Sequence, residues 1–263
     1  MKKLFLLGLL MIMSVCYIFG QIDSKKLFVA TNSFVTEASD NWEIYDGKFT
    51  SLDTINEEYT FDGGFIVKIL VGSSRYDFTC TVKNEGDDFS VSISDMKSYA
   101  CDKKGKIIKN GSIMNTSSRV VEQYAAQMKD EIKARMNEIS DAELDARYTK
   151  VVAHPATLNL LTETMSELAL KKFVEKNVNG KTVELEIVLE SIDENVVLGE
   201  VQELAYRATG HLSDKKVSPL FSIFVYSNND KLLTSKIGST YKAKGTVEFT
   251  KISTYWFYKI NEQ

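Results

Sequence analysis

Alternation of apolar and polar residues with a period of two is the feature that most constrains the fold of this chain. It is clearest over residues 76–93, where one set of side chains is apolar and the intervening set is polar. The apolar members are Tyr76, Phe78, Cys80, Val82, Phe89, Val91 and Ile93. Successive side chains of a strand point to opposite faces, so this pattern predicts a hairpin with one face in a core and one in water. The acidic segment 84–88 supplies its turn.

A helical pattern follows the hairpin. Apolar residues recur at three- and four-residue steps over 121–139, and residues 115–118 offer N-cap side chains. This stripe predicts an amphipathic helix that covers one face of the preceding sheet. Residues 65–71 predict a buried strand, and the Gly-rich segment 61–65 before it predicts a hairpin turn. Residues 22–40 fit either a short helix or a strand.

The pattern restarts near Pro155, and we expect a domain boundary within residues 148–157. A second amphipathic helix is expected over 158–174. Five strands should follow, at 183–190, 204–208, 221–226, 241–249 and 255–260, with a short helix over 231–237 before the fourth. This order is compatible with a small closed barrel of the OB type. The expected fold class is therefore α+β. The N-terminal domain, 21–150, has an antiparallel sheet with a covering helix, and the C-terminal domain, 156–263, has a helix followed by an OB-like five-stranded β-barrel.

The first twenty residues have the order of a secretory signal. Lys2 and Lys3 precede an apolar run over 4–15, and the apolar character ends at Gly20. We expect a signal peptide over 1–20, cleaved after Gly20, and a periplasmic or secreted protein without a transmembrane segment in its mature chain. The alternative is a lipoprotein anchored at Cys16, although Val15 stands where such processing normally needs a small residue.

The charge balance limits the partners. The chain of 263 residues has a formal net charge of −4, with 44% hydrophobic and 26% charged residues, which is the composition of a folded globular protein. Without Lys2 and Lys3 the balance is 30 basic against 36 acidic residues. This acidic excess argues against a general binder of nucleic acid, because phosphate neutralisation dominates that affinity.

No catalytic pattern emerges from the sequence. His154 and His211 are the two histidines, and neither has a nucleophile or carboxylate indicated beside it in the sequence. If Cys16 is removed with the signal peptide, the two remaining cysteines and the two distant histidines show no metal-ligand spacing. We therefore expect no catalytic residues, no metal site, no cofactor and no enzyme activity. An oxidising compartment would permit a disulfide between Cys80 and Cys101, and the sequence leaves this open.

One basic-aromatic cluster could bind a ligand. It comprises Lys242, Lys244, Tyr255 and Trp256, with Lys251 between them. A basic groove with stacking aromatic rings is how OB domains hold single strands. The alternative is that the aromatic rings fill the barrel core and the lysines protect an exposed strand. Tyr255 and Trp256 are adjacent on a strand, so only one of them can face outward.

Two segments resemble known families. Residues 75–82, Arg-Tyr-Asp-Phe-Thr-Cys-Thr-Val, with 89–95, Phe-Ser-Val-Ser-Ile-Ser-Asp, resemble the central hairpin of an uncharacterised bacterial exported-domain family with a TBP-like fold. This resemblance covers about 25–145. Residues 179–185 and 237–247 resemble the first and fourth strands of tRNA-anti-like OB-fold domains of bacterial exported proteins, over about 158–260. Neither family brings catalytic residues, so the resemblance implies a fold and no ligand.

These patterns predict an exported, non-catalytic protein of the bacterial cell envelope that serves as a binding or accessory module. Its partner would be an envelope protein or ligand whose identity the sequence leaves open, as it does the oligomeric state. The alternative is a binder of single-stranded nucleic acid or another polyanion through the OB-like domain. An unrecognised hydrolase is a third hypothesis, which a deep pocket with facing carboxylates would favour.

Overall fold

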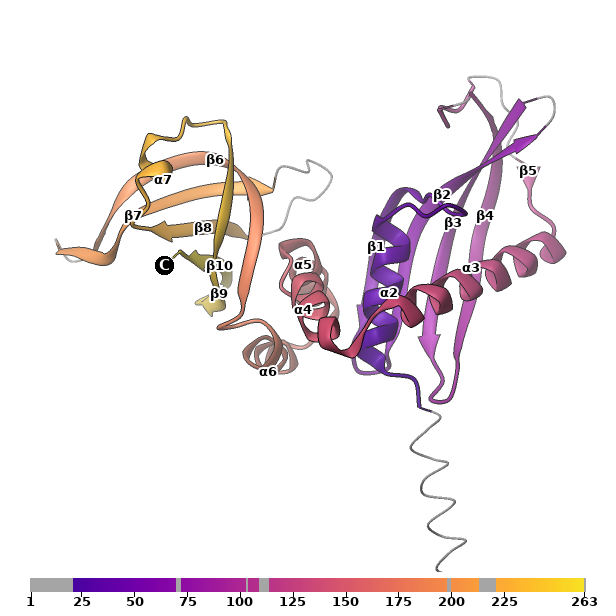
Figure 1. The fold of residues 1–263 in the computed structure, drawn as a ribbon, viewed down its shortest axis with the longest axis horizontal. Coiled ribbons are helices and arrows are strands. Elements are labelled where there is room, and N and C mark those ends of the chain that lie inside the picture. Colours follow the sequence, from indigo (N-terminus) through magenta and orange to yellow (C-terminus); the bar gives the residue numbers. More distant parts are fainter. Residues whose placement is uncertain are drawn as a thin grey trace, which may run out of the picture. The chain divides into compact units, whose positions relative to one another are not determined.

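The computed structural model describes residues 21–69, 72–102, 104–108, 114–197, 200–212 and 221–262. The expected signal peptide, including Cys16, lies outside these residues. The chain divides into two compact units between Leu144 and Asp145. Both units combine helices with antiparallel strands, so the expected α+β class is confirmed (Figure 1). Pro155 lies inside the second unit, as the first residue of a helix.

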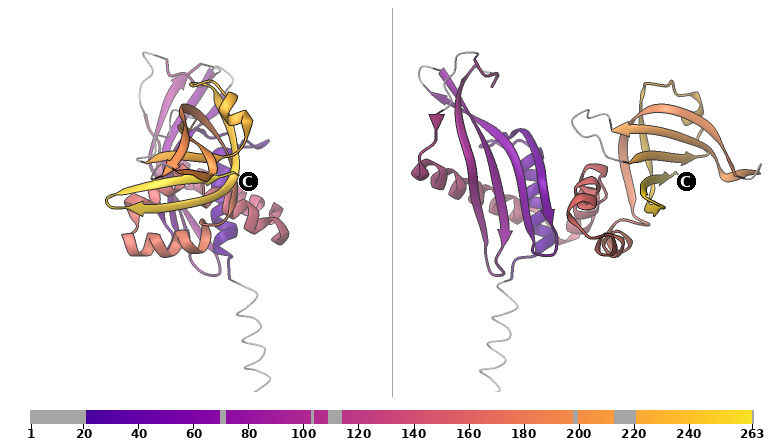
Figure 2. Two further views of the ribbon diagram at one scale, coloured as in Figure 1. Left: turned by 90° about the vertical axis from the view of Figure 1, so that its left-hand side faces the viewer. Right: turned by 180° about the vertical axis from the view of Figure 1, so that it is seen from behind.

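The first unit is a twisted antiparallel sheet with two helices on one face (Figures 1 and 2). Helix α2 (Ser24–Thr36) precedes the sheet, and helix α3 (Ser118–Glu138) follows it and packs against α2. The strands lie in sequence order, as β1 (Tyr45–Asp53), β2 (Glu58–Ile69), β3 (Gly72–Asn84), β4 (Phe89–Cys101) and β5 (Met114–Asn115). The ambiguous segment 22–40 is thus largely helical, because the Asp23 side chain caps α2 by accepting the amides of Lys25 and Lys26.

The predicted hairpin and covering helix are both present. Strand β3 pairs with β4 in the register Cys80 with Ile93 and Val82 with Val91. Helix α3 begins after the N-cap residue Ser117. Its buried side chains meet a core that is rich in aromatic rings, whose fully buried members include Phe34, Phe61 and Phe89.

The glycine pair at 63–64 does not form a turn, which corrects the expectation for residues 61–65. Both glycines lie in the middle of β2, which pairs with β3 without interruption from Glu58 to Ile69. A β-carbon on Gly63 would lie 2.6 Å from Cγ2 of Ile44. Glycine here therefore serves the close approach of the segment that follows α2, rather than a reversal of the chain.

The two cysteines are not bridged. Cys80 and Cys101 are both buried free thiols. Cys101 pairs with Ser73, which is seven residues from Cys80 on the same strand. At roughly 3.3 Å per residue this separates the cysteines by about 23 Å, whereas a disulfide needs Cα atoms within about 7 Å. The Cys80–Cys101 disulfide that the sequence leaves open therefore does not form, because β4 continues along β3 past Ile93, with a bulge between Ser94 and Lys97, instead of folding back.

Helices α4 (Asp141–Val152), α5 (Pro155–Thr164) and α6 (Glu167–Asn177) precede the strands of the second unit, and the division between the units falls within α4. The single helix expected over 158–174 is wrong. Met165 is extended, and Ser166 starts α6 by accepting the amide of Ala169 at 3.3 Å. His154 caps α5 in the same way, with Nδ1 accepting the amide of Ala156 at 3.2 Å.

A closed five-stranded barrel completes the second unit. Its strands, in ring order, are β10 (Tyr255–Asn261), β8 (Ser222–Ser227), β7 (Glu200–Leu212), β6 (Thr182–Val197) and β9 (Thr240–Ile252). Strands β8 and β10 pair in parallel, and the other neighbours are antiparallel. The short helix expected before the fourth strand is α7 (Asp230–Thr234).

Strands β9 and β10 pack closely where the barrel closes. A β-carbon on Gly245 would lie 2.3 Å from the carbonyl oxygen of Asn261, so only glycine permits β9 and the end of β10 to approach so closely. Tyr258 is fully buried, and its hydroxyl donates to the carbonyl of Ala153 at 2.8 Å. This bond fastens the barrel to the chain between α4 and α5. None of the helices in the described residues is of a length and apolar character that would cross a membrane.

Candidate functional site

The lysines of the expected basic cluster are neutralised by their neighbours. On the outer face of the barrel, Lys242 stands opposite Glu186 and Lys244 opposite Glu184. The ammonium of Lys242 also lies 2.6 Å from a carboxylate oxygen of Glu184. This hydrogen bond raises the pKa of Lys242 and lowers the pKa of Glu184. Strands β6 and β9 therefore carry opposite charges side by side on this face, and Lys242 and Lys244 also line a depression of about 850 Å³ with Lys231 and Glu262.

The aromatic members lie far from these lysines. Tyr255 pairs with Ile252, eight residues beyond Lys244 on β9, which is about 26 Å along the strand at roughly 3.3 Å per residue. Tyr255 is 70% exposed, whereas Trp256 stacks on the core residue Phe249 with ring centroids 4.8 Å apart. Only one of the two rings faces outward, as the strand period predicts. Lys251 is paired with Glu167 of α6. The structure thus does not bring Lys242, Lys244, Tyr255 and Trp256 together into one surface.

The two histidines lie in different parts of the second unit. The imidazole Nδ1 of His211 lies 2.9 Å from Glu190 on the barrel surface, with both side chains about half exposed. His154 is a helix cap, as described above. Within the described ranges no three histidine, cysteine or carboxylate side chains are grouped so that they could hold a metal ion.

A different surface has the shape of a ligand site. The first unit contains a depression of about 770 Å³ bounded by the segment after α2, by β2 and by α3. Its lining combines aromatic rings with polar and acidic side chains. These residues are Ser39, Asp40, Asn41, Trp42, Glu43, Tyr45, Phe65, Ile66, Val67, Lys68, Tyr124, Gln127, Asp130 and Glu131. We refer to it as the aromatic depression.

Three rings form its apolar wall. Trp42 meets Phe65 nearly edge-on, with centroids 5.2 Å apart and planes at 72°. Tyr124 of α3 packs against the same phenylalanine at 4.7 Å and faces Trp42 at 6.4 Å. Phe65 is buried, whereas Trp42 and Tyr124 are each only partly covered. Tilted and edge-to-face contacts of this kind stabilise an aromatic cluster, so the wall is a packed surface with two rings accessible from outside.

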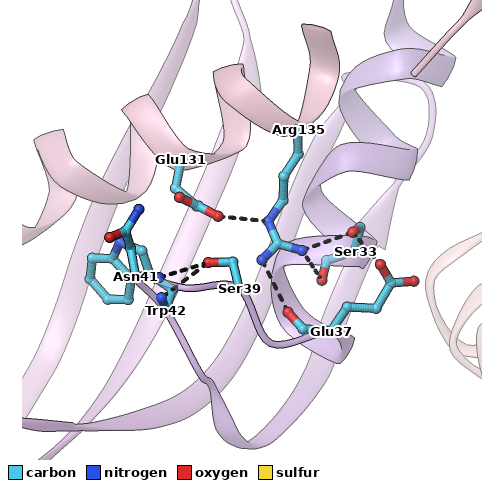
Figure 3. Close-up of polar contacts among 7 residues, drawn as sticks. All are labelled: Ser33, Glu37, Ser39, Asn41, Trp42, Glu131 and Arg135. Atoms are coloured by element: carbon cyan, nitrogen blue, oxygen red, sulfur yellow. Dashed lines mark hydrogen bonds and ion pairs between the residues drawn. The ribbon is translucent and has the colours of Figure 1, made fainter. Parts of the chain in front are cut away.

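A buried arginine fixes the backbone that carries Trp42. Arg135 of α3 is 7% exposed and reaches the last turn of α2 (Figure 3). Its guanidinium donates to the carbonyl of Ser33 at 2.8 Å and to the carbonyl of Glu37 at 3.1 Å. It also donates to the hydroxyl of Ser33 at 2.9 Å and to the carboxylate of Glu131 at 3.1 Å. The carbonyl of Ser33 also accepts the amide of Glu37 at 2.8 Å, whereas the carbonyl of Glu37 lies beyond the last turn, so Arg135 satisfies it and anchors the chain as it leaves the helix.

The next residues are held by a compact turn. The hydroxyl of Ser39 accepts the amides of Asn41 and Trp42 at 3.3 and 3.1 Å (Figure 3). The amide of Ser39 donates in return to the carbonyl of Trp42 at 2.7 Å. Ile44 then rests against Gly63 of β2. The indole of Trp42 is therefore positioned by its own backbone before any ligand arrives.

Acidic side chains surround this wall. Asp40 and Glu43 come from the turn, and Asp130 and Glu131 come from α3. The carboxylate of Glu43 accepts the hydroxyl of Tyr45 at 2.6 Å, which raises the pKa of that tyrosine. Lys68 is the one basic residue in the described lining. The depression thus has an apolar wall and a predominantly negative rim.

This site was not foreseen from the sequence. Tyr124 was expected simply as a core residue of the helical stripe, and Trp42 belongs to no periodic segment. The depression unites a turn, a strand and a helix that are up to 90 residues apart in the chain, and such proximity has no local signal. The only sequence cue is that Trp42 lies beside two acidic residues, Asp40 and Glu43.

We predict that Arg135→Ala lowers the free energy of unfolding by about 3–5 kcal/mol, because the carboxylate of Glu131 and the carbonyl of Glu37 lose their buried partner. Arg135→Lys should be intermediate, since an ammonium cannot reproduce the guanidinium fork. Lys129→Ala is the control on the same helix; its pair with Asp88 is partly exposed, and we expect a loss of about 1 kcal/mol or less. Urea denaturation measures all three, and equal losses for Arg135→Ala and Lys129→Ala would contradict the assignment.

The comparisons with known proteins add no relative. No family model matches the chain, and no match is found among the curated proteins or the solved structures.

Proposed function

We propose that this protein is an exported, non-catalytic binding module of the cell envelope, and that the aromatic depression of its first unit is the ligand site. The observation that carries the proposal is the partly exposed indole of Trp42, which a hydrogen-bonded turn, anchored through Arg135, holds against Phe65 and Tyr124. One part of the indole packs on Phe34, Phe65 and Tyr124, and the part that stays uncovered is available to a ligand. Binding sites in proteins commonly combine such an apolar wall with a few polar groups.

The dimensions and rigidity of the depression support a small ligand. Its volume of about 770 Å³ is within the range of small-molecule sites, which is roughly 300–1,000 Å³. A binding surface that is already ordered loses less conformational entropy when it takes up a ligand. The hydrogen bonds made by Ser39 and Arg135 keep the backbone of the depression ordered.

We assign the barrel an accessory role. Its five strands, its parallel pair β8 and β10, and the helix between β8 and β9 are compatible with the OB type, and we propose that assignment. Binding of single strands needs a continuous positive groove with exposed aromatic platforms. The pairing of Lys242 and Lys244 with glutamates, and the burial of one face of Trp256 on Phe249, argue against such a groove. Nucleic acid is therefore not among the ligands that we propose.

The site can be tested by mapping ligands on the amides of the whole protein. A panel of small organic cations, organic anions, neutral sugars and a short oligonucleotide is added in turn, and chemical-shift changes are followed by NMR. We expect at least one small-molecule class to shift residues 39–45 and 124–131, with saturation, and Tyr124→Ala to abolish the effect. Trp256→Phe is the matched control in the barrel and should leave it unchanged. Shifts confined to the barrel, or no saturable shift from any class, would contradict the proposed site.

Export is the second part of the proposal, and it rests on Lys2, Lys3 and the apolar run over 4–15. N-terminal sequencing of the protein isolated from its native source should give Gln21 as the first residue. A chain that starts at a lipid-modified Cys16 would replace this with the lipoprotein alternative. A chain that retains Met1 in the cytoplasm would exclude export.

A further inference from the structure

We propose that the aromatic depression takes a small organic cation, namely an ammonium group with an apolar body. This inference rests on the proposed function, because it assigns a ligand class to the same site. It depends on two features of the depression that point to the same chemistry, which are the partly exposed aromatic rings and the sign of the charges around them.

The rings offer a surface that attracts cations. The face of an aromatic ring carries negative electrostatic potential, and a cation within about 6 Å of its centroid is attracted, most strongly by tryptophan. Trp42 and Tyr124 are both partly exposed, and they stand nearly perpendicular, with their planes at 81°. Two perpendicular rings form a corner in which methyl or methylene groups on a nitrogen can contact both aromatic surfaces.

The charged side chains around the depression favour a positively charged ligand. The lining contains the carboxylates of Asp40, Glu43, Asp130 and Glu131, and the single ammonium of Lys68. Glu131 is committed to Arg135, yet the remaining three carboxylates still outnumber the lysine. An anion brought to this rim would be repelled, and a neutral molecule would gain nothing from it. A cation is attracted by the rim and by the ring faces at once.

Helix α3 places the two features on one surface. Tyr124, Gln127 and Glu131 follow each other at steps of three and four residues, so they lie on the same side of the helix. Asp130 stands next to this row, and it is exposed. Asp130 is six residues beyond Tyr124, about 9 Å along the helix at roughly 1.5 Å per residue, so its charge lies near enough to attract an ammonium group held by the rings.

The test uses the two tryptophans of the chain. In Trp256→Phe, Trp42 is the only indole, so its fluorescence reports on the depression alone. Choline is the cationic probe, and 3,3-dimethyl-1-butanol is its uncharged counterpart of the same shape. We expect choline to change the Trp42 emission saturably, and the alcohol to bind at least about tenfold more weakly. Binding of choline should weaken as salt is raised, because the rim is exposed.

Variants separate the contributions. Tyr124→Ala should abolish the response, and Asp40→Asn combined with Asp130→Asn should weaken choline binding about fivefold or more without altering the alcohol. Asp141→Asn removes an exposed carboxylate outside the depression and is the matched control, with no expected change. Equal binding of choline and the alcohol, stronger binding of acetate, or no response to choline would each overturn the cation assignment. The NMR panel distinguishes these outcomes from failure of the site, because a neutral or anionic ligand that shifts residues 39–45 would leave the proposed function in place.

Discussion

Arg135 lies buried between α3 and the end of α2, where its guanidinium donates to two main-chain carbonyls, a hydroxyl and a carboxylate. Burying a charge is costly unless every donor is satisfied, and removing one partner of such a group is strongly destabilising. The same contacts fix the direction in which the chain leaves α2, and the turn at Ser39 and the ring of Trp42 depend on that direction. A core contact in the first unit therefore determines the geometry of a surface that we propose binds a ligand.

Charged side chains are arranged differently on the surfaces of the two units. On the barrel, Glu184 and Glu186 stand opposite lysines of β9, and Lys251 is paired with Glu167. These neighbours offset one another along the strands, although Lys242 and Lys244 also line a depression with Lys231 and Glu262. Around the aromatic depression the acidic residues outnumber the basic ones and stand beside exposed rings. The sequence suggested a candidate site on the barrel. The structure favours the first unit instead, because acidic side chains in excess over basic ones lie there beside partly exposed aromatic rings.

Periodic segments of the sequence predict their elements well, and the failures have particular causes. The hairpin of β3 and β4, helix α3 and the barrel strands follow from alternation or from steps of three and four residues. Strand β1 was not foreseen, because Gly47 and Ser51 occupy two of the less exposed positions of its alternation, where an apolar side chain would have marked the strand. Gly63 was expected in a turn, because the residues around it do not reveal that Ile44 packs too closely for a β-carbon at this position of the strand. Ser166 was not recognised as the cap that divides α5 from α6, since the apolar stripe continues across it. Trp42 joins the site through contacts that no local pattern encodes.

Hydrogen exchange at the turn tests most directly the claim that Arg135 pre-orders the site. The amides of Ser39, Asn41 and Trp42 are bonded within the turn, so we predict that they are protected in the unmodified protein without ligand. In Arg135→Lys their protection should fall by at least about tenfold, while amides in the centre of β3, such as that of Cys80, lose no more than the overall change in stability explains. Turn amides that exchange at the unprotected rate in the unmodified protein, or that keep their protection in Arg135→Lys, would contradict the account.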